Sequence, residues 1–356
     1  MRPLLLVVGS VVALGAEPGQ PGEEAAKPTE LGEAAAAMKP GEWREFPTKA
    51  MTRALQYTDH ATGKRMTNST FTWTNELCWD SVTNSIYILN AGHGQPMQFF
   101  RYTAAANAWT AEEKPAKILG THVYNHHTAT DDGVYYFQLM ARPWDQHRNM
   151  LYRYDTQKRE WTSEQIPKGY NVPPGMCLSF FRPLNALVQF REGGLNLYDL
   201  ETKKWSRIPA KIQRGDIKKQ EGVGRLHFVM TVSEPARLVI FGGGDYHWKG
   251  NSPASKTLYA MDAEKKVTRL PDAPVRLAIT KVVLNSDPIS GDILVVREGD
   301  LYSLDLEKKT WVQHADRKPP FTGNHIMAAR IRDHGVLFFL VPKTNKVYLY
   351  KHSEKK

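Results

Sequence analysis

The sequence lacks most of the signatures that identify common enzyme classes. Only two of its 356 residues are cysteine, and no cysteine–histidine cluster has the spacing of a zinc site. There is no glycine-rich phosphate loop and no serine nucleophile elbow, which excludes the motif-bearing nucleotide-binding and hydrolase classes. Beyond the N-terminus no apolar run is long enough to cross a bilayer. Helical apolar stripes are also scarce, so an all-β chain is expected.

The N-terminus has the one long apolar run. Arg2 precedes apolar residues from Leu4 to Leu14, and small residues follow, which predicts a secretory signal peptide over residues 1–16. The alternative is an uncleaved anchor, for which the run is short. Residues 17–40 are rich in Pro, Gly, Glu and Ala and predict a flexible linker, with one fraying helical turn near 30–37. A secreted or periplasmic protein with no integral membrane segment after signal cleavage is expected.

What the chain has in abundance is one repeated pattern. The segments "FFRYTAAANAW", "LYRYDTQKREW", "LNLYDLETKKW" and "LYSLDLEKKTW" each place an anchor residue seven positions before a tryptophan. A fifth copy, "LYAMDAEKKVTRLP", is one residue shorter and has Val267 in place of the tryptophan. Each copy alternates apolar and polar residues around a polar turn, which is typical of a two-stranded hairpin.

Two further apolar runs precede these hairpins, so the repeating unit is predicted to have four strands. The tryptophan-type positions recur about every 50 residues, which indicates propeller blades rather than a sandwich. The C-terminal unit has only three strands. Its missing strand is predicted to be "GEWREFP" at 41–47, so that Trp43 closes the last blade. The prediction is a six-bladed β-propeller of four-stranded blades over residues 41–356.

Two segments resemble the kelch motif. "LVIFGGG" at 238–244 ends a strand in glycines before a hairpin, and "FREGGLNLYDLETKKW" at 190–205 has the glycine pair followed by a spaced tyrosine and tryptophan. The chain is therefore similar to the kelch-repeat and galactose-oxidase-like propellers, with the full motif clear in two blades. That resemblance implies a fold which hosts carbohydrate-active enzymes, sugar isomerases and protein-binding scaffolds, and does not by itself assign a function.

The positions of the cysteines and the distribution of charge limit which disulfide and which binding partners can be expected. Cys78 and Cys177 fall on the innermost strands of blades one and three, which are not neighbours, so two buried free thiols are expected instead of a disulfide. The formal net charge is +10, but the basic residues are interleaved with acids in hairpin turns. This spread predicts a solvated rim and no nucleic-acid partner, because a nucleic-acid reader gathers its basic residues into one stripe.

The candidate ligand site follows from loop lengths. Loops between the second and third strands share one face with the loops that enter each first strand, around the channel mouth. The long loops of blades two and four combine aromatic, histidine, acidic and basic side chains, a mixture that suits a sugar ring. The predicted ligand-binding residues are His93, His122, Trp144, His147, Arg148, Asp245, His247, Trp248 and His325. The structural alternative is that Trp144 and Trp248 fold back over their own blades.

Further polar residues recur where the chain enters the first strands. They are Tyr124, His126, His127, Arg225, His227, Arg276 and Asn324. They could form a polar ligand site, or simply line a hydrated channel. No catalytic residue, metal or cofactor is assigned.

Function is predicted to be non-catalytic binding of a carbohydrate or an extracytoplasmic envelope protein. The alternative is a carbohydrate-active enzyme on the same fold. A copper radical oxidase would use a Cys78–Tyr124 cross-link, but a Tyr-His pair in a later blade is missing. A sugar mutarotase could use Arg225, Arg276 and His325, but no glutamate stands beside them in the sequence.

Overall fold

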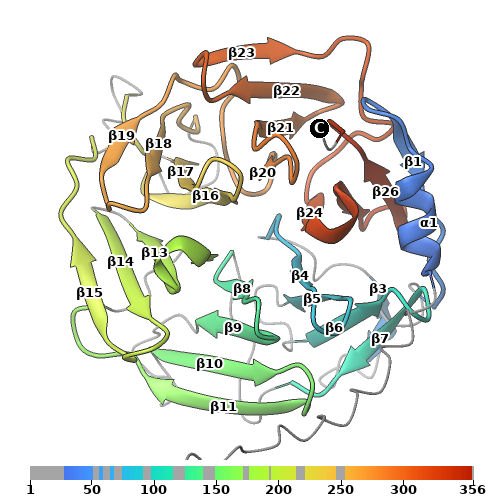
Figure 1. Cartoon of the computed structure of the whole chain (residues 1–356), viewed down its shortest axis with the longest axis horizontal. Coiled ribbons are helices and arrows are strands. Elements are labelled where there is room, and N and C mark those ends of the chain that lie inside the picture. Colours follow the sequence, from blue (N-terminus) through green and yellow to red (C-terminus); the bar gives the residue numbers. More distant parts are fainter. Residues whose placement is uncertain are drawn as a thin grey trace, which may run out of the picture.

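The structure is a ring of four-stranded antiparallel sheets around a central channel. It is a computed structural model that describes residues 28–50, 56–58, 65–67, 74–90, 98–114, 125–138, 149–170, 176–191, 194–213, 221–245 and 253–354. Six such sheets make a six-bladed β-propeller, with the first strand of each blade nearest the axis and the last at the perimeter (Figure 1). The predicted fold class is confirmed.

The blades follow one another along the chain. Blades one to three are formed by β4 (Cys78–Asp80), β5 (Ser85–Asn90), β6 (Gln98–Thr103) and β7 (Ala108–Glu112); β8 (His127–Ala129), β9 (Val134–Gln138), β10 (Met150–Asp155) and β11 (Glu160–Gln165); and β12 (Cys177–Phe181), β13 (Ala186–Arg191), β14 (Gly194–Asp199) and β15 (Trp205–Ile208). Blades four and five are formed by β16 (Leu226–Ser233), β17 (Leu238–Asp245), β18 (Leu258–Met261) and β19 (Val267–Arg269), and by β20 (Val283–Ser286), β21 (Ile293–Arg297), β22 (Asp300–Asp305) and β23 (Thr310–Gln313). A separate hairpin consists of β2 (Gln56–Thr58) and β3 (Arg65–Thr67).

The sixth blade is closed by the N-terminal strand. It contains β24 (Met327–Ile331), β25 (Val336–Val341), β26 (Lys346–Tyr350) and β1 (Trp43–Glu45). β1 pairs antiparallel with β26 and puts Trp43 opposite Tyr350. The predicted closure is therefore confirmed, and the two ends of the domain are joined in one sheet that covers the edge of β26.

The repeated sequence forms the outer hairpin of each blade. The anchor lies directly opposite the tryptophan, as in the pair Tyr154 and Trp161. The aspartate after the anchor organises the turn: Asp155 Oδ1 accepts hydrogen bonds from the backbone N–H groups of Gln157 (3.2 Å) and Lys158 (2.9 Å). This is the local bond by which aspartate favours turns, and Asp199 and Asp305 repeat it.

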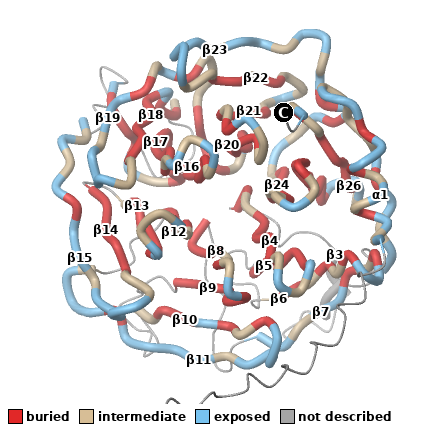
Figure 2. The backbone as a smooth tube through the Cα atoms, viewed as in Figure 1, coloured by how far each residue is buried: buried red, intermediate tan, exposed pale blue. Residues whose placement is uncertain are grey.

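The tryptophans link neighbouring blades, but most are less buried than the repeat suggests. Trp109 is fully buried, whereas Trp161, Trp205 and Trp311 are half-buried. The indole Nε1 of Trp161 donates to the carbonyl oxygen of Glu113, just after the outer strand of the preceding blade (2.8 Å). These three rings are only partly covered because outer strands lie at the perimeter, where Figure 2 shows exposed chain.

Residues 28–40, which their composition assigns to the linker, contact the propeller. They contain α1 (Glu30–Ala36), a helix whose N-cap Thr29 accepts a hydrogen bond from the N–H of Gly32 (3.1 Å). Leu31 and Ala35 are fully buried in the cluster shared by blades one and six. The helical turn expected near 30–37 is present, and its apolar face is packed and not frayed.

The inner strands form the core. Figure 2 shows burial concentrated toward the axis. Cys78 and Cys177 lie on the first strands of blades one and three as buried free thiols, as expected. Burial raises the pKa of both thiols well above the ordinary value, so neither is held as a reactive thiolate.

Candidate functional site

The two ends of the channel differ in chemistry. We call the long-loop face the side that carries the loops between second and third strands and the loops entering the first strands. The other side, with the loops that follow each first strand, is the short-loop face. Most of the predicted ligand residues lie outside the described residues: His93, His122, Trp144, His147, Arg148, His247 and Trp248. Asp245 and His325 are described.

Asp245 is paired with another residue singled out from the sequence. It ends β17, and its Oδ2 lies 2.6 Å from Nδ1 of His227, which stands near the start of β16. Both side chains are buried. Pairing of β16 with β17 puts Leu226 opposite Asp245, and Gly244 permits this close approach: it has φ +85°, and a Cβ there would lie 2.6 Å from the carbonyl oxygen of Leu226.

His325 lies on the same face, two blades further along the ring. Its backbone N–H donates to the carbonyl oxygen of Thr280 (3.0 Å), while the N–H of Ile279 donates to the carbonyl oxygen of His227 (3.3 Å). A short backbone relay thus joins the loops of blades four, five and six. Burial lowers the pKa of His325, so its imidazole is neutral at pH 7. Its Nδ1 is buried and has no hydrogen-bond partner among the described residues.

His127 does not belong to the channel mouth. It is buried on β8, where its Nδ1 lies 2.8 Å from the hydroxyl of Tyr135 and 3.4 Å from Sγ of Cys78. Burial lowers its pKa to about 3, so the ring stays neutral. His127 is thus part of the contact between blades one and two. The prediction that it is one of the polar residues at the channel mouth is wrong. Tyr124 lies outside the described residues.

A network of ion pairs spans the channel at the short-loop face. Arg332, which follows β24 of blade six, bonds Asp131 of blade two (2.6 Å) and Glu234 of blade four (2.9 Å). Arg182 of blade three bonds Asp131 (2.5 Å) and lies 3.6 Å from Glu234. Burial alone would raise the pKa of Asp131, but Arg182 and Arg332 lower it. These four side chains form a closed ring of alternating charge.

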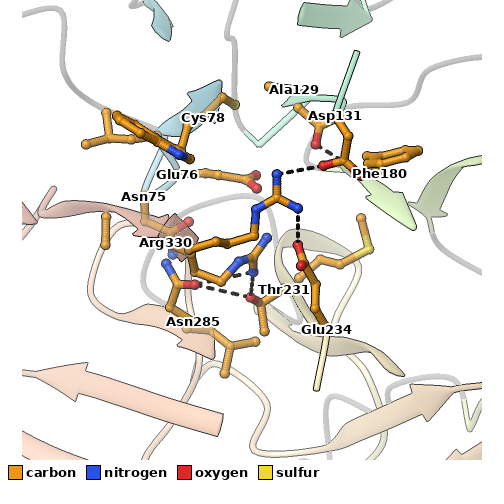
Figure 3. Close-up of a pocket in the computed structure, with 17 residues that line it drawn as sticks. Asn75, Glu76, Cys78, Ala129, Asp131, Phe180, Thr231, Glu234, Asn285 and Arg330 are labelled. Carbon is orange, nitrogen blue, oxygen red and sulfur yellow. Dashed lines mark hydrogen bonds and ion pairs between the residues drawn. The ribbon is translucent and has the colours of Figure 1, made fainter. Parts of the chain in front are cut away.

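Beneath this ring is a cavity of about 50 Å³ that contains two more charged residues (Figure 3). Glu76, just before β4, points its carboxyl group toward the arginines, and Arg330 of β24 extends into the channel. Nη1 of Arg330 donates to Oγ1 of Thr231 (2.5 Å) and Oδ1 of Asn285 (3.4 Å). Burial raises the pKa of Glu76 well above its ordinary value, although Arg330 opposes the shift.

The sequence reasoning did not select Glu76 or Arg330, nor the four residues of the ion-pair ring. It looked for an acid beside the arginines of the long loops, whereas the acid–arginine pair of the channel lies on first strands. One signal was available: "ELCW" and "MAARIR" each place a charge within an apolar first strand. A charge is buried in such a strand only when the channel supplies partners.

No metal centre or membrane span emerges from the described part of the chain. Those residues contain no group of three or more His, Cys, Asp or Glu side chains placed to hold a metal ion. Among the same residues, no helix has the length and apolar character needed to cross a membrane.

Comparisons with known proteins leave the function open. No family model matches the chain, and no curated protein matches it in sequence. A similar solved structure is the extracellular domain assigned to a one-component system of B. thetaiotaomicron, at 15% identity and a TM-score of 0.44. The match covers 75% of this chain and 32% of that one, so the chain spans about a third of that structure's length. The class that the fold defines is thus a six-bladed β-propeller.

Proposed function

We propose that this protein is a non-catalytic binding propeller, secreted or periplasmic, that takes a carbohydrate or an extracytoplasmic protein on its long-loop face. The observation that carries the proposal is the neutral imidazole of His325, whose buried Nδ1 has no partner among the described residues. A buried polar atom without a partner is costly. A ligand hydroxyl can donate to this nitrogen or accept from it, in either tautomer.

The described part of this face favours binding over catalysis. The carboxyl group of Asp245 is held by His227 at 2.6 Å, so the acid among the predicted ligand residues is already engaged by a neighbour. The enzyme alternative, a sugar mutarotase or a copper oxidase, would require a further acid or ligand set at this mouth. The signal peptide over residues 1–16 and the kelch relationship are parts of the same proposal, and the N-terminal composition and the glycine run 242–244 support them.

A glycan array probed with the chain from residue 28 onward tests this function. We expect retention on a defined group of glycans. The double variant Trp144→Ala/Trp248→Ala should lose it with little change in melting temperature, because aromatic stacking supplies much of the affinity for a sugar ring. His325→Asn should weaken binding about tenfold; asparagine tolerates the left-handed backbone found there, φ 62°.

The matched control is His314→Ala on the rim, where His314 lies 2.8 Å from the hydroxyl of Ser303 on the adjacent outer strands. It should bind like the wild type. If the double tryptophan variant binds normally, the site is not on these loops. If it unfolds, the two tryptophans are structural plugs. If the chain retains envelope proteins but no glycan, the ligand is an extracytoplasmic protein and not a carbohydrate.

A further inference from the structure

The cavity under the ion-pair ring contains Arg330, whose guanidinium group donates hydrogen bonds from only one of its three nitrogen atoms within the described chain. Among the described residues, both hydrogen bonds of the Arg330 guanidinium are donated by Nη1, to Oγ1 of Thr231 at 2.5 Å and to Oδ1 of Asn285 at 3.4 Å. These acceptors come from the first strands of blades four and five and fix the orientation of the group. Within the described chain, Nε and Nη2 of Arg330 have no acceptor at hydrogen-bond distance. That edge of a guanidinium is suited to binding a carboxylate through two parallel bonds.

Glu76 supplies a second unpartnered group in the same cavity. Its backbone lies beside Ala328 of blade six through a parallel bridge, which brings its side chain next to Arg330. The Glu76 carboxyl group faces the arginines in Figure 3. Its Oε2 is buried and, among the described residues, has no hydrogen-bond partner. No ion pair joins it to Arg330 within the described structure, although both residues line the cavity.

Charge counting shows what the cavity lacks. Asp131 and Glu234 are balanced by Arg182 and Arg332 in the ring above. Arginine stays protonated in proteins, so Arg330 contributes one positive charge. Because burial favours the neutral form of Glu76, that carboxyl holds its proton to higher pH and then donates a hydrogen bond. When Glu76 is protonated, the guanidinium edge and the carboxylic acid together offer three N–H or O–H donors, and the positive charge of Arg330 is uncompensated within the cavity.

We propose that the Glu76–Arg330 cavity is a carboxylate-binding site, in which the Nε–Nη2 edge of Arg330 grips both carboxylate oxygens and Glu76 donates to one of them. A volume of about 50 Å³ holds a few water molecules, so the site takes a carboxylate the size of formate or acetate, or the carboxylate end of a larger acid. The ion pairs above it lie at the short-loop face, where the side chains of Asp131 and Glu234 are 32% and 29% exposed. The site goes beyond the proposed function, which uses the other face.

Titration calorimetry with sodium acetate, against sodium chloride at equal ionic strength, tests the site in the chain from residue 28 onward. We expect a dissociation constant on the order of 1 mM, within the range open to a ligand of four heavy atoms. Arg330→Lys keeps the charge but removes the two-pronged edge, so acetate binding should weaken at least tenfold. Glu76→Gln keeps a neutral donor and should bind acetate within about threefold of the wild type, or more tightly. The matched control is Arg269→Lys on the rim, where Arg269 pairs with Asp272 (3.0 Å); it should bind as the wild type does.

If Arg330→Lys does not fold, a second variant still allows the proposal to be tested. Thr231→Val removes the acceptor that orients Nη1 and should weaken acetate binding about threefold or more. The same titration is repeated with glucuronate, a larger carboxylic acid, and with glucose, which has no carboxylate. Binding of acetate but not glucuronate identifies a small free acid as ligand, and binding of both identifies the carboxylate end of a larger acid. The proposal is wrong if the folded wild type does not bind acetate, or if Arg330→Lys binds it as tightly. Either result leaves the glycan experiment unaffected, because that one depends on Trp144 and Trp248.

Discussion

Replacing Trp43 by alanine removes the residue that holds the two ends of the chain together. Its ring stacks on Tyr350 at 4.3 Å between centroids and lies 5.0 Å from Phe339 and 5.4 Å from Phe321. The indole Nε1 also donates to the carbonyl oxygen of Arg317 (2.9 Å), which follows the outer strand of blade five. One side chain therefore contacts its own blade and the neighbouring one.

The size of the effect follows from these contacts. Truncating a buried tryptophan to alanine costs about 3–5 kcal/mol, and Trp43 is half-buried, so about 3 kcal/mol is expected. Unfolding entropy is about 2 cal/mol/K per residue, so a domain of this size loses roughly 1.5 °C for each kcal/mol. Trp43→Ala should therefore lower the melting temperature by about 4–5 °C. Trp43→Phe keeps the stacking and loses the Nε1 bond, worth about 1 kcal/mol, and should lower it by roughly 1.5 °C.

The melting temperatures of these variants, and of forms of the protein beginning at residues 28 and 48, are measured by circular dichroism. The form beginning at 48 lacks both α1 and β1, so it should melt below Trp43→Ala and aggregate on heating through the uncovered edge of β26. Equal melting temperatures for the two forms, or a Trp43→Ala melt within 1 °C of the wild type, would show that ring closure contributes no stability and refute the reasoning.

Three further outcomes can be measured. Trp109→Ala should cost about 4 kcal/mol because the ring is fully buried, and Trp161→Ala roughly half of that; equal costs in urea denaturation would contradict the burial argument. Glu76 has a raised folded-state pKa, so the stability it contributes is complete below pH 4.5, its unfolded value, and is lost as pH rises toward the folded value. Glu76→Gln should therefore melt higher than the wild type at pH 7 and equally at pH 4, and a constant difference would count against it. Cys78 and Cys177 should react with a thiol reagent only after denaturation, giving two equivalents; rapid labelling of the native protein would contradict their burial.

The architecture could be predicted because it depends on local pattern repeated along the chain. The Asp155 turn and its copies, and the anchor residue opposite each tryptophan of the repeat, are determined by residues within a single hairpin. Closure by Trp43 could be predicted because three strands at the C-terminus leave a blade incomplete. Fine differences in exposure along the perimeter, such as full burial of Trp109 against half-burial of Trp161, depend on what the neighbouring blade places over each ring.

The channel chemistry could not be predicted in the same way. The contacts of Arg330 reach Thr231, 99 positions away, and those of Arg332 in blade six reach Asp131 in blade two. Such pairs depend on blade order and on the depth of each residue along its first strand. A single sequence gives the order of the blades but not the depth of each residue along its first strand. The pairing of His227 with Asp245 was missed because both residues were noted separately, whereas the register of β16 against β17 places Asp245 opposite Leu226, next to His227.

The same geometry separates the two proposals into different ends of one channel. All first strands run in the same direction from the long-loop face to the short-loop face, so residues early in these strands gather at one mouth and residues after them at the other. His325 and His227 precede or begin their strands, whereas Arg332, Asp131 and Glu234 follow theirs. The ion-pair ring ties blades two, three, four and six together across the short-loop mouth. A large ligand entering there would meet these ion pairs. The proposed glycan site is therefore assigned to the long-loop face, and the proposed carboxylate site to the cavity under the ring.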